Sequence, residues 1–450
     1  MKKLFKKYFY YLFLLALIFF LFYKHSLNAD EGVILNGAWN LFNKRTLYVD
    51  FFEIIAPGSF YLINLFFKLF SPNYFIANIV SLIILWLGSL GIYQSTNLIQ
   101  KNKLNFLFPI FFILSLAPFP IINHNLYSTV LLIWSSYFFI KGIKSNSLKN
   151  FIISGFLGGL SIIFLQQKGI AFCAASFIFI LFFILKNKNY YFKNILGYCV
   201  GIIIPVICLF LKWSPNLLWK NLIVFPMLTY WEVNQTSFLL LLSFFLVLFY
   251  FFIYFIKKSI LIKYLLFVQF FLLLSTIPLP DYYHLIINIF PLLILSSLLL
   301  ANNNNKMTKL LIIVFIFILN IPTFSYLKNN YKPFYSCKKN PDYQELMVYI
   351  EKKCEGKYIY SGPFLPNLYL ETKKLSATPF GLLIENQSTD EQYNEALNYF
   401  KKNQPTCAVL NYYDNMYIKF NSTGNNVLEN YIKNNYKLEY QKNNFFIYHQ

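Results

Sequence analysis

The sequence predicts a polytopic α-helical membrane protein with a small C-terminal α/β domain. The chain has 450 residues, of which 57% are hydrophobic and 13% charged, whereas soluble proteins carry roughly 25% charged residues. Long apolar runs fill its first part, and the composition changes near residue 328. A helix needs about 20 apolar residues to cross a bilayer. Eleven runs approach this length: 8–23, 74–97, 105–120, 126–142, 150–166, 169–185, 194–212, 237–256, 262–278, 285–301 and 308–326.

The placement of the lysines predicts the orientation. Lysines precede the first run, as in a signal peptide, but that run is long and ten more follow. Further lysines gather in alternate loops, at 101–103, 141–149, 186–193, 257–263 and 306–309. The turns at 121–125 and 279–284 contain none. This positive-inside pattern predicts a cytoplasmic N-terminus and a multi-pass protein of a bacterial plasma (inner) membrane. The formal charge of +21 is spread over many loops, which argues against a nucleic-acid partner.

Two domains are expected, a transmembrane domain at 1–327 and an extracytoplasmic α/β domain at 328–450. In the second, "PDYQELMVYIEKK" precedes the strand-like "KYIYSG", and "DEQYNEALNYFKKN" precedes "CAVLNYY". Helices that alternate with strands predict a small α/β unit. It contains no glycine-rich phosphate loop and no catalytic constellation, so we expect it to shape acceptor access or to contact a partner.

The cysteines indicate one candidate disulfide. Cys354 and Cys407 each precede a predicted strand, so a bridge between them is one hypothesis. Cys337 is a poorer partner for Cys354, because an intervening helix of about a dozen residues would hold them roughly 18 Å apart. No set of Cys and His residues has the spacing of a zinc site.

Acidic residues are rare in the first 327 residues, and all are expected on the external side. There are six: Asp30, Glu31, Asp50, Glu53, Glu232 and Asp281. Acidic residues can lie on the external side simply because lysines are concentrated on the other side, and this explanation accounts for Glu232. It explains Asp30 and Glu31 poorly, because they abut the first span, where charged groups are costly and usually functional.

Three stretches carry a resemblance to a known family. They are "ADEGVILNGAWNLFNKRTLYVDFFEIIAPGSFYLINLFFKLF" (29–70), "IPLPDYYHLIINIFPLL" (277–293) and, more weakly, "GFLGGLSIIFLQQKGI" (155–170). Their order and sidedness resemble the GT-C-fold glycosyltransferases that use polyprenyl-phosphate sugars, such as protein O-mannosyltransferases and the lipid A aminoarabinose transferase. The tail stretches "IYSGPFLPNLYLETKKLSATPF" and "PTCAVLNYYD" are similar to the soluble domain of bacterial members. The resemblance implies a GT-C fold and a lipid-linked sugar donor.

The first external loop holds the candidate catalytic carboxylates. The resemblance implies that Asp30 is the general base that accepts the proton of the acceptor hydroxyl, a role that requires hydrogen-bond reach. Glu31 is expected to orient the loop, to bind acceptor or to help hold a divalent ion. Asp50 and Glu53 flank a bend before Pro57, where they either line the same cavity or form a solvated loop face.

A departing lipid phosphate needs positive charge and hydrogen-bond donors. Lys168, between two spans, either meets the phosphate or merely snorkels at a helix end. Arg45 is the only arginine, and its planar fork suits phosphate. His284, beside Tyr283, is expected to contact phosphate or sugar, and His124 in the other lysine-free turn is a weaker candidate.

The expected partners are a polyprenyl-phosphate sugar, membrane lipid, and a glycan, lipid or protein acceptor. Metal dependence varies among relatives, so a divalent cation is left open as a cofactor. The apolar stretches "GVILNGAWNLFN" and "SFYLINLFFKLF" are too short to span and are expected to lie along the membrane interface. The alternative function is a transporter or flippase, although such proteins usually place their acids near the bilayer midplane.

Overall fold

A computed structural model describes most of the chain. The described residues are 2–23, 28–186, 192–230, 238–255, 260–277, 279–302, 306–329, 341–412 and 424–450. Glu232 and Cys337 lie outside them. The chain divides into two compact units, each described by itself: unit 1 (residues 1–23, 81–214 and 235–333) and unit 2 (residues 24–80, 215–234 and 334–450). The expected domain boundary at 327/328 stays a prediction.

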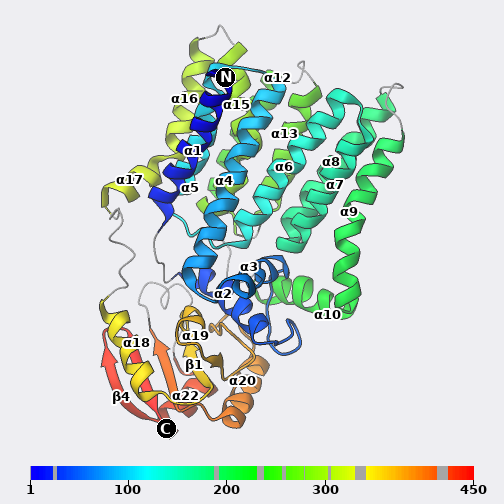
Figure 1. Ribbon diagram of the computed structural model, residues 1–450. Coiled ribbons are helices and arrows are strands. Elements are labelled where there is room, and N and C mark those ends of the chain that lie inside the picture. Colours follow the sequence, from blue (N-terminus) through cyan, green and yellow to red (C-terminus); the bar gives the residue numbers. More distant parts are fainter. Residues whose placement is uncertain are drawn as a thin grey trace. The chain divides into compact units, whose positions relative to one another are not determined.

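Unit 1 is helical (Figure 1). Its elements are α1 (Lys2–Phe22), most of α4 (Tyr74–Ile99), the 3₁₀ turn η1 (Lys103–Phe106), α5 (Leu107–Leu116), α6 (His124–Ser145), α7 (Leu148–Phe164), α8 (Gln166–Lys186), α9 (Phe192–Lys212), α12 (Phe238–Phe255), α13 (Ile260–Leu274), α14 (Tyr282–Ile287), α15 (Phe290–Asn302), α16 (Lys306–Leu319) and α17 (Ile321–Asn329).

Three of the described helices, α4, α6 and α9, are long and apolar enough to cross a membrane. Shorter apolar helices among the described residues include α7, α13 and the apolar parts of α1 and α8. The expectation of eleven spans stays a prediction. The run expected at 285–301 is divided at Asn288 into the short α14 and the longer α15.

Glycines bring α7 and α9 into close contact. A Cβ atom at Gly155 would lie 2.1 Å from the carbonyl oxygen of Tyr198, and one at Gly201 would lie 2.3 Å from that of Ile152. Small residues let the backbones of membrane helices approach in this way. Figure 1 shows α6, α7, α8 and α9 side by side in the bundle.

Unit 2 combines the first loop with the C-terminal segment. Its helices are α2 (Ala29–Phe42), α3 (Gly58–Leu69), the first turns of α4, α10 (Pro215–Trp219), the π-helical turns η2 (Lys220–Val224) and η3 (Pro226–Tyr230), α18 (Pro341–Lys353), α19 (Asn367–Glu371), α20 (Asp390–Asn403) and α22 (Val427–Asn435). Its strands are β1 (Tyr358–Gly362), β2 (Leu375–Ser376), β3 (Cys407–Asn411), β4 (Lys437–Lys442) and β5 (Phe445–His449).

The strands form a mixed sheet in the order β2-β1-β3-β5-β4. β1 pairs in parallel with both β2 and β3, whereas β5 is antiparallel to β3 and β4. The sheet expected in the C-terminal segment is therefore present, and its two predicted strands are the adjacent pair β1 and β3.

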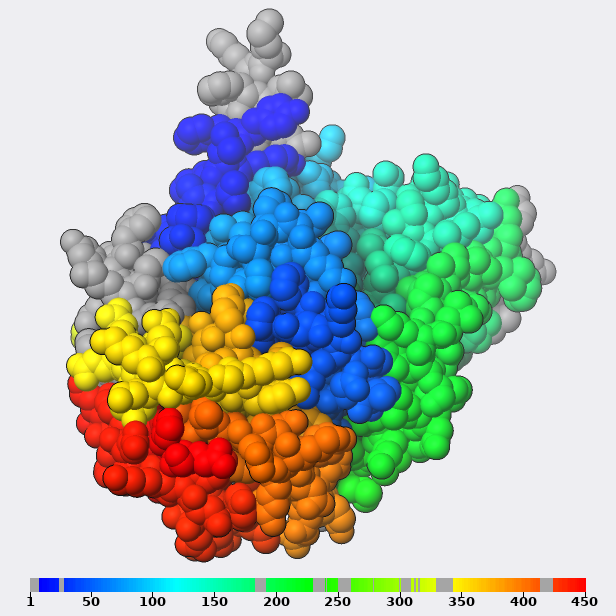
Figure 2. Space-filling model, turned by 60° about the horizontal axis from the view of Figure 1, so that its bottom comes forward, coloured from blue at the N-terminus to red at the C-terminus, as the bar shows by residue number. Residues whose placement is uncertain are grey.

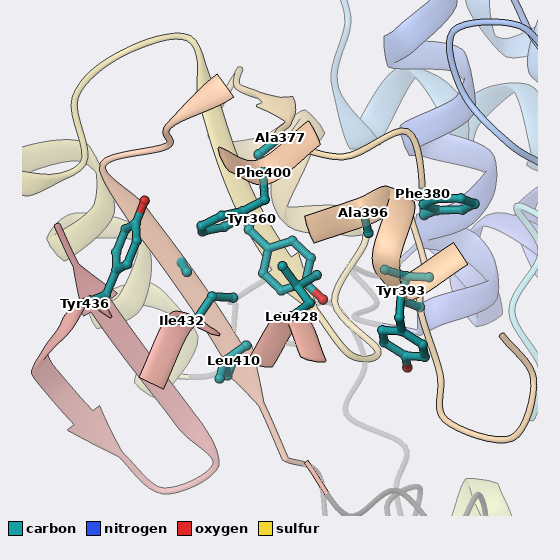
Figure 3. Close-up of a cluster of buried hydrophobic side chains, with 12 residues drawn as sticks. Tyr360, Ala377, Phe380, Tyr393, Ala396, Phe400, Leu410, Leu428, Ile432 and Tyr436 are labelled. Carbon is teal, nitrogen blue, oxygen red and sulfur yellow. The ribbon is translucent and has the colours of Figure 1, made fainter. Parts of the chain in front are cut away.

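One face of this sheet is covered by α20 and α22. Their apolar faces meet the strands in a buried cluster, in which the rings of Tyr360 and Phe400 lie 5.9 Å apart. Figure 3 shows Tyr360 and Phe400 beside each other, with Leu428 of α22 close by. Phe52 of the first loop also packs against this cluster.

Helix α2 is a core helix of unit 2, which corrects the expectation that it lies along the interface. Every residue from Glu31 to Leu41 is buried. A helix buried on all sides has no face left for lipid. Helix α3 keeps an exposed apolar edge at Leu65 and Leu69, as an interfacial helix would.

A disulfide joins Cys354 and Cys407, so the bridge inferred from the sequence is confirmed. It ties the end of α18 to β3 and closes a loop of 53 residues. Cross-linking a loop of this length lowers the conformational entropy of the unfolded chain. In the chain-entropy model this stabilises the folded state by roughly 4 kcal/mol.

Replacing Cys354 by Ser is expected to lower the thermal stability of the full chain by up to about 4 kcal/mol. Thermal unfolding of the detergent-solubilised protein, with and without reductant, measures this. Reductant should destabilise the wild type and leave C354S unchanged. The matched control is Cys208→Ser, because Cys208 is a free and exposed cysteine on α9. Equal stability of C354S and C208S would contradict the expectation.

Candidate functional site

The candidate base and its neighbour begin helix α2. The Asn28 side chain caps this helix by accepting the Asp30 N–H at 2.8 Å. Asp30 is exposed within the described residues, and acids in a first turn are favoured by the helix dipole. Glu31 is 1% exposed and accepts a hydrogen bond from the Tyr74 hydroxyl at 3.1 Å. The structure thus separates the pair: Asp30 is exposed, and Glu31 joins α2 to the start of α4.

Asp50 and Arg45 organise the loop after α2. The Asp50 carboxylate accepts the Thr46 N–H at 2.6 Å, which closes the turn. The Arg45 guanidinium donates to the Asn40 side chain at 3.0 Å. Burial lowers the pKa of Arg45, and the tyrosines at 358, 369 and 399 act electrostatically on it. Since arginine stays protonated in proteins, Arg45 is a fixed cation that faces the C-terminal segment.

Glu53 is a buried carboxyl group. It is 8% exposed, and burial raises its pKa to about 8. Tyr48 lies within electrostatic range, and burial raises its pKa as well. The solvated-face alternative therefore fails for Glu53, whereas it holds for the exposed Asp50. At neutral pH Glu53 carries a proton, which makes it a hydrogen-bond donor rather than a charge.

Lys168 is buried in the first turn of α8. It is 2% exposed, so it is neither in a loop nor snorkelling to the surface. Its ammonium group donates to the Thr129 hydroxyl at 3.0 Å and, more weakly, to the Asn125 carbonyl at 3.4 Å. Both partners belong to the first turns of α6. These are neutral oxygens, and the described residues place no carboxylate within ion-pair distance of the ammonium.

Two histidines accompany Lys168 within unit 1. His124 opens α6 and lies within electrostatic range of both Lys168 and His284. Its Nδ1 is buried and has no hydrogen-bond partner among the described residues. Three of the predicted phosphate contacts, which come from α6, α8 and α14, are therefore brought together. We call Lys168, His124 and His284 the cation cluster.

Asp281 fixes the ring of His284. Its carboxylate caps α14 by accepting the His284 N–H at 2.9 Å and lies 2.8 Å from the ring Nδ1. A ring held at Nδ1 directs Nε2 away from the carboxylate. Tyr283 packs against Phe119, with ring centroids 4.9 Å apart, and against His284.

The cation cluster lies in a unit that is nearly free of acids. Asp281 is the only Asp or Glu in the sequence of unit 1, and it is engaged by His284. A buried charge is expensive unless it is paired. Lys168 therefore has no carboxylate partner among the described residues of unit 1.

A metal ion has no ready set of ligands among the described residues. No three His, Cys, Asp or Glu side chains in this part of the chain are placed to hold one.

Sequence reasoning missed several partners of these residues. Tyr74, Thr129 and Asn125 contact Glu31 or Lys168 across at least 39 positions of sequence, and no spacing rule links them. Asn36 and Asn40 could have been found, because two asparagines four apart inside an apolar helix pattern indicate a buried polar contact.

The comparisons with known proteins agree on one fold. Residues 55–219 match the family model described as dolichyl-phosphate-mannose-protein mannosyltransferase. No curated protein matches the chain by sequence. Among solved structures, the chain is similar to ArnT from Cupriavidus metallidurans bound to undecaprenyl phosphate, with 11% identity, 97% of each chain covered and a TM-score of 0.62.

Two further structures extend this likeness. ArnT from the same organism in the apo state gives 12% identity and a TM-score of 0.59, with 97% of this chain and 96% of that chain covered. The Archaeoglobus fulgidus oligosaccharyltransferase in the apo form gives 10% identity and a TM-score of 0.52, with 90% of this chain and 70% of that chain covered. The family match and these likenesses together identify the chain as a membrane protein with the GT-C glycosyltransferase fold.

Proposed function

We propose that the chain transfers a sugar from a polyprenyl-phosphate donor to an envelope glycan, lipid or protein acceptor on the extracytoplasmic side of a bacterial membrane. Asp30 is the general base, and the cation cluster binds the donor phosphate. Undecaprenyl phosphate, which the similar ArnT structure holds, is the leaving group that this proposal assigns to the donor.

One observation carries the proposal: Lys168 is buried among neutral oxygens in a unit almost without acids. The ammonium group of a purely structural lysine is expected either to pair with a carboxylate or to reach water. A lipid phosphate supplies the missing charge and arrives from the bilayer. His284 is oriented by Asp281, and the Nδ1 of His124 has no hydrogen-bond partner in the described part of the chain. Both rings can donate to phosphate oxygens.

These residues can carry out the transfer step. An acceptor hydroxyl attacks the anomeric carbon, and the bond from that carbon to the phosphate oxygen breaks. The hydroxyl proton passes to the Asp30 carboxylate. The bonding electrons leave with the lipid phosphate, whose charge grows by one unit. Donors and cations placed where this charge develops lower the barrier, and Lys168, when protonated, supplies a full positive charge.

Glu31 and Glu53 support the loop in this scheme. Glu31 is held by Tyr74, so it keeps the start of α2 in place. Protonated Glu53 lets the loop stay buried without a second negative charge near Asp50. The exposed carboxylate of Asp30 is the one that a hydroxyl can reach, which separates the base from its neighbours.

Replacing Asp30 by Asn should abolish turnover while the protein still folds, because the amide cannot accept the proton. A loss of about 10²- to 10⁴-fold is expected for a general base. The measurement is mass spectrometry of envelope glycans and lipids from a deletion strain that carries each variant. Asp390→Asn is the matched control, since Asp390 is also an exposed first-turn acid of a helix in unit 2. Normal product from D30N would refute the role of Asp30.

Replacing Lys168 by Met should weaken binding of undecaprenyl phosphate by roughly ten- to a hundredfold, because hydrogen bonds to charged groups contribute about 1.5–3 kcal/mol. Titration of the purified protein with undecaprenyl phosphate in detergent, followed by tryptophan fluorescence, gives the affinity. Lys263→Met, at an exposed lysine of α13, is the control and should bind as the wild type does. Unchanged affinity of K168M would remove the cation cluster from the proposal.

Replacing Glu53 by Gln should change how stability depends on pH. The folded-state pKa of Glu53 is raised to about 8 from an ordinary 4.5, so the wild type loses stability as pH rises through this interval. E53Q lacks the buried titrating group and should gain stability over the wild type progressively towards pH 8. Thermal unfolding at several pH values tests this, and parallel pH curves for the two proteins would be inconsistent with a buried titrating Glu53.

A further inference from the structure

The helix that carries Asp30 is enclosed by the C-terminal segment of the chain. Ala29, directly before Asp30, packs against a buried cluster formed by Phe364 and Ile384. A Cβ atom at Gly32 would lie 1.8 Å from the side-chain oxygen of Asn367. In Figure 2, the dark-blue residues of the first loop lie beside the yellow and orange residues of this segment.

Further contacts hold the remainder of α2. The Trp39 indole N–H donates to the Lys374 carbonyl at 2.8 Å, and the Lys373 ammonium lies 5.5 Å from the centre of the Trp39 ring. The hydrogen bond from the Trp39 indole fixes both the rotation and the axial position of the helix at its last turns. The first and last turns of α2 are therefore both held by residues more than 300 positions away in the sequence.

The middle of α2 meets the C-terminal segment at Gly381. A Cβ atom there would lie 2.1 Å from the Asn36 amide nitrogen and 4.0 Å from a Glu53 carboxyl oxygen. Beside it, the Phe52 N–H donates to the Pro379 carbonyl at 2.9 Å, and the rings of Phe52 and Phe380 lie 5.6 Å apart. Only a residue without a side chain allows this approach.

We propose that residues 364–384 of the C-terminal segment are a positioning element of the transfer reaction, acting on Asp30 through α2. This inference rests on the proposed function, and it assigns a task to a domain that has no catalytic constellation of its own. A base must lie within hydrogen-bond reach of the hydroxyl it deprotonates, and misplacement by about 1 Å can cost about 100-fold in rate. Gly381 and Asn367 are the positioning residues.

The test uses Gly381→Ala in the full-length chain. The added methyl group would collide with the Asn36 amide, so this buried side chain must move, and the proposal expects α2 to move with it. Product formation, measured by mass spectrometry of envelope glycans and lipids from the complemented deletion strain, should fall by up to about 100-fold. The affinity of the purified protein for undecaprenyl phosphate, which the cation cluster binds, should stay at the wild-type value.

The second variant is the double substitution Gly381→Ala with Asn36→Ala. Removing the Asn36 amide makes room for the methyl group, so product formation should recover relative to G381A. A shared contact shows up as such non-additivity. The recovery distinguishes positioning from general damage, because an unrelated folding defect would not be repaired by a further truncation.

Gly356→Ala is the matched control. Gly356 lies in the same domain at φ +82°, and a Cβ atom there meets nothing within 4 Å. The substitution strains the backbone without touching α2, so it should lower the unfolding temperature and leave product formation unchanged.

Two outcomes overturn the inference. Wild-type product formation by G381A would show that α2 does not need this contact, and equal losses in G356A and G381A would show that only the stability of the domain matters. D30N separates this failure from failure of the proposed function: an inactive D30N with an active G381A refutes the positioning element alone.

Discussion

Buried charge is the constraint on which the candidate residues of each unit depend. Apolar surroundings favour the neutral form of an ionisable group unless a partner is supplied. Each buried group meets this condition differently: Glu31 accepts a hydrogen bond from Tyr74, and Glu53 keeps its proton. Lys168 contacts neutral oxygens alone among the described residues. In the proposed function an anionic ligand completes this set, and a lipid phosphate has the required charge and can arrive from the bilayer.

The burial of α2 explains the role of the C-terminal segment. Helix α2 is buried over eleven consecutive residues, and it packs against both α3 and α19. Residues 364–384 cover part of the surface of α2 through Asn367, Lys374 and Gly381. A disulfide and a buried aromatic cluster stabilise that segment. The stability of the described C-terminal segment therefore contributes to the stability of α2, the helix that carries the candidate base.

The sequence predicts the helices and strands of the fold better than it predicts the contacts between them. Hydropathy and lysine placement predict a polytopic chain, and the alternation of helix and strand predicts the sheet and the bridge from Cys354 to Cys407. The sequence predicts Lys168, His124 and His284 separately as candidate contacts, since each stands beside a helix end in a chain poor in charge. Their convergence follows from the packing of α6, α8 and α14, which no local pattern encodes. Likewise, α2 has the periodicity of an interfacial helix, and only its distant partners show that it is buried.

The most direct measurement of the central claim is an experimental structure of the full chain with undecaprenyl phosphate bound. The account predicts the phosphate within hydrogen-bond distance of the Lys168 ammonium, with His284 or His124 contributing a second contact. A phosphate bound elsewhere, with Lys168 still donating only to Thr129 and Asn125, would contradict it.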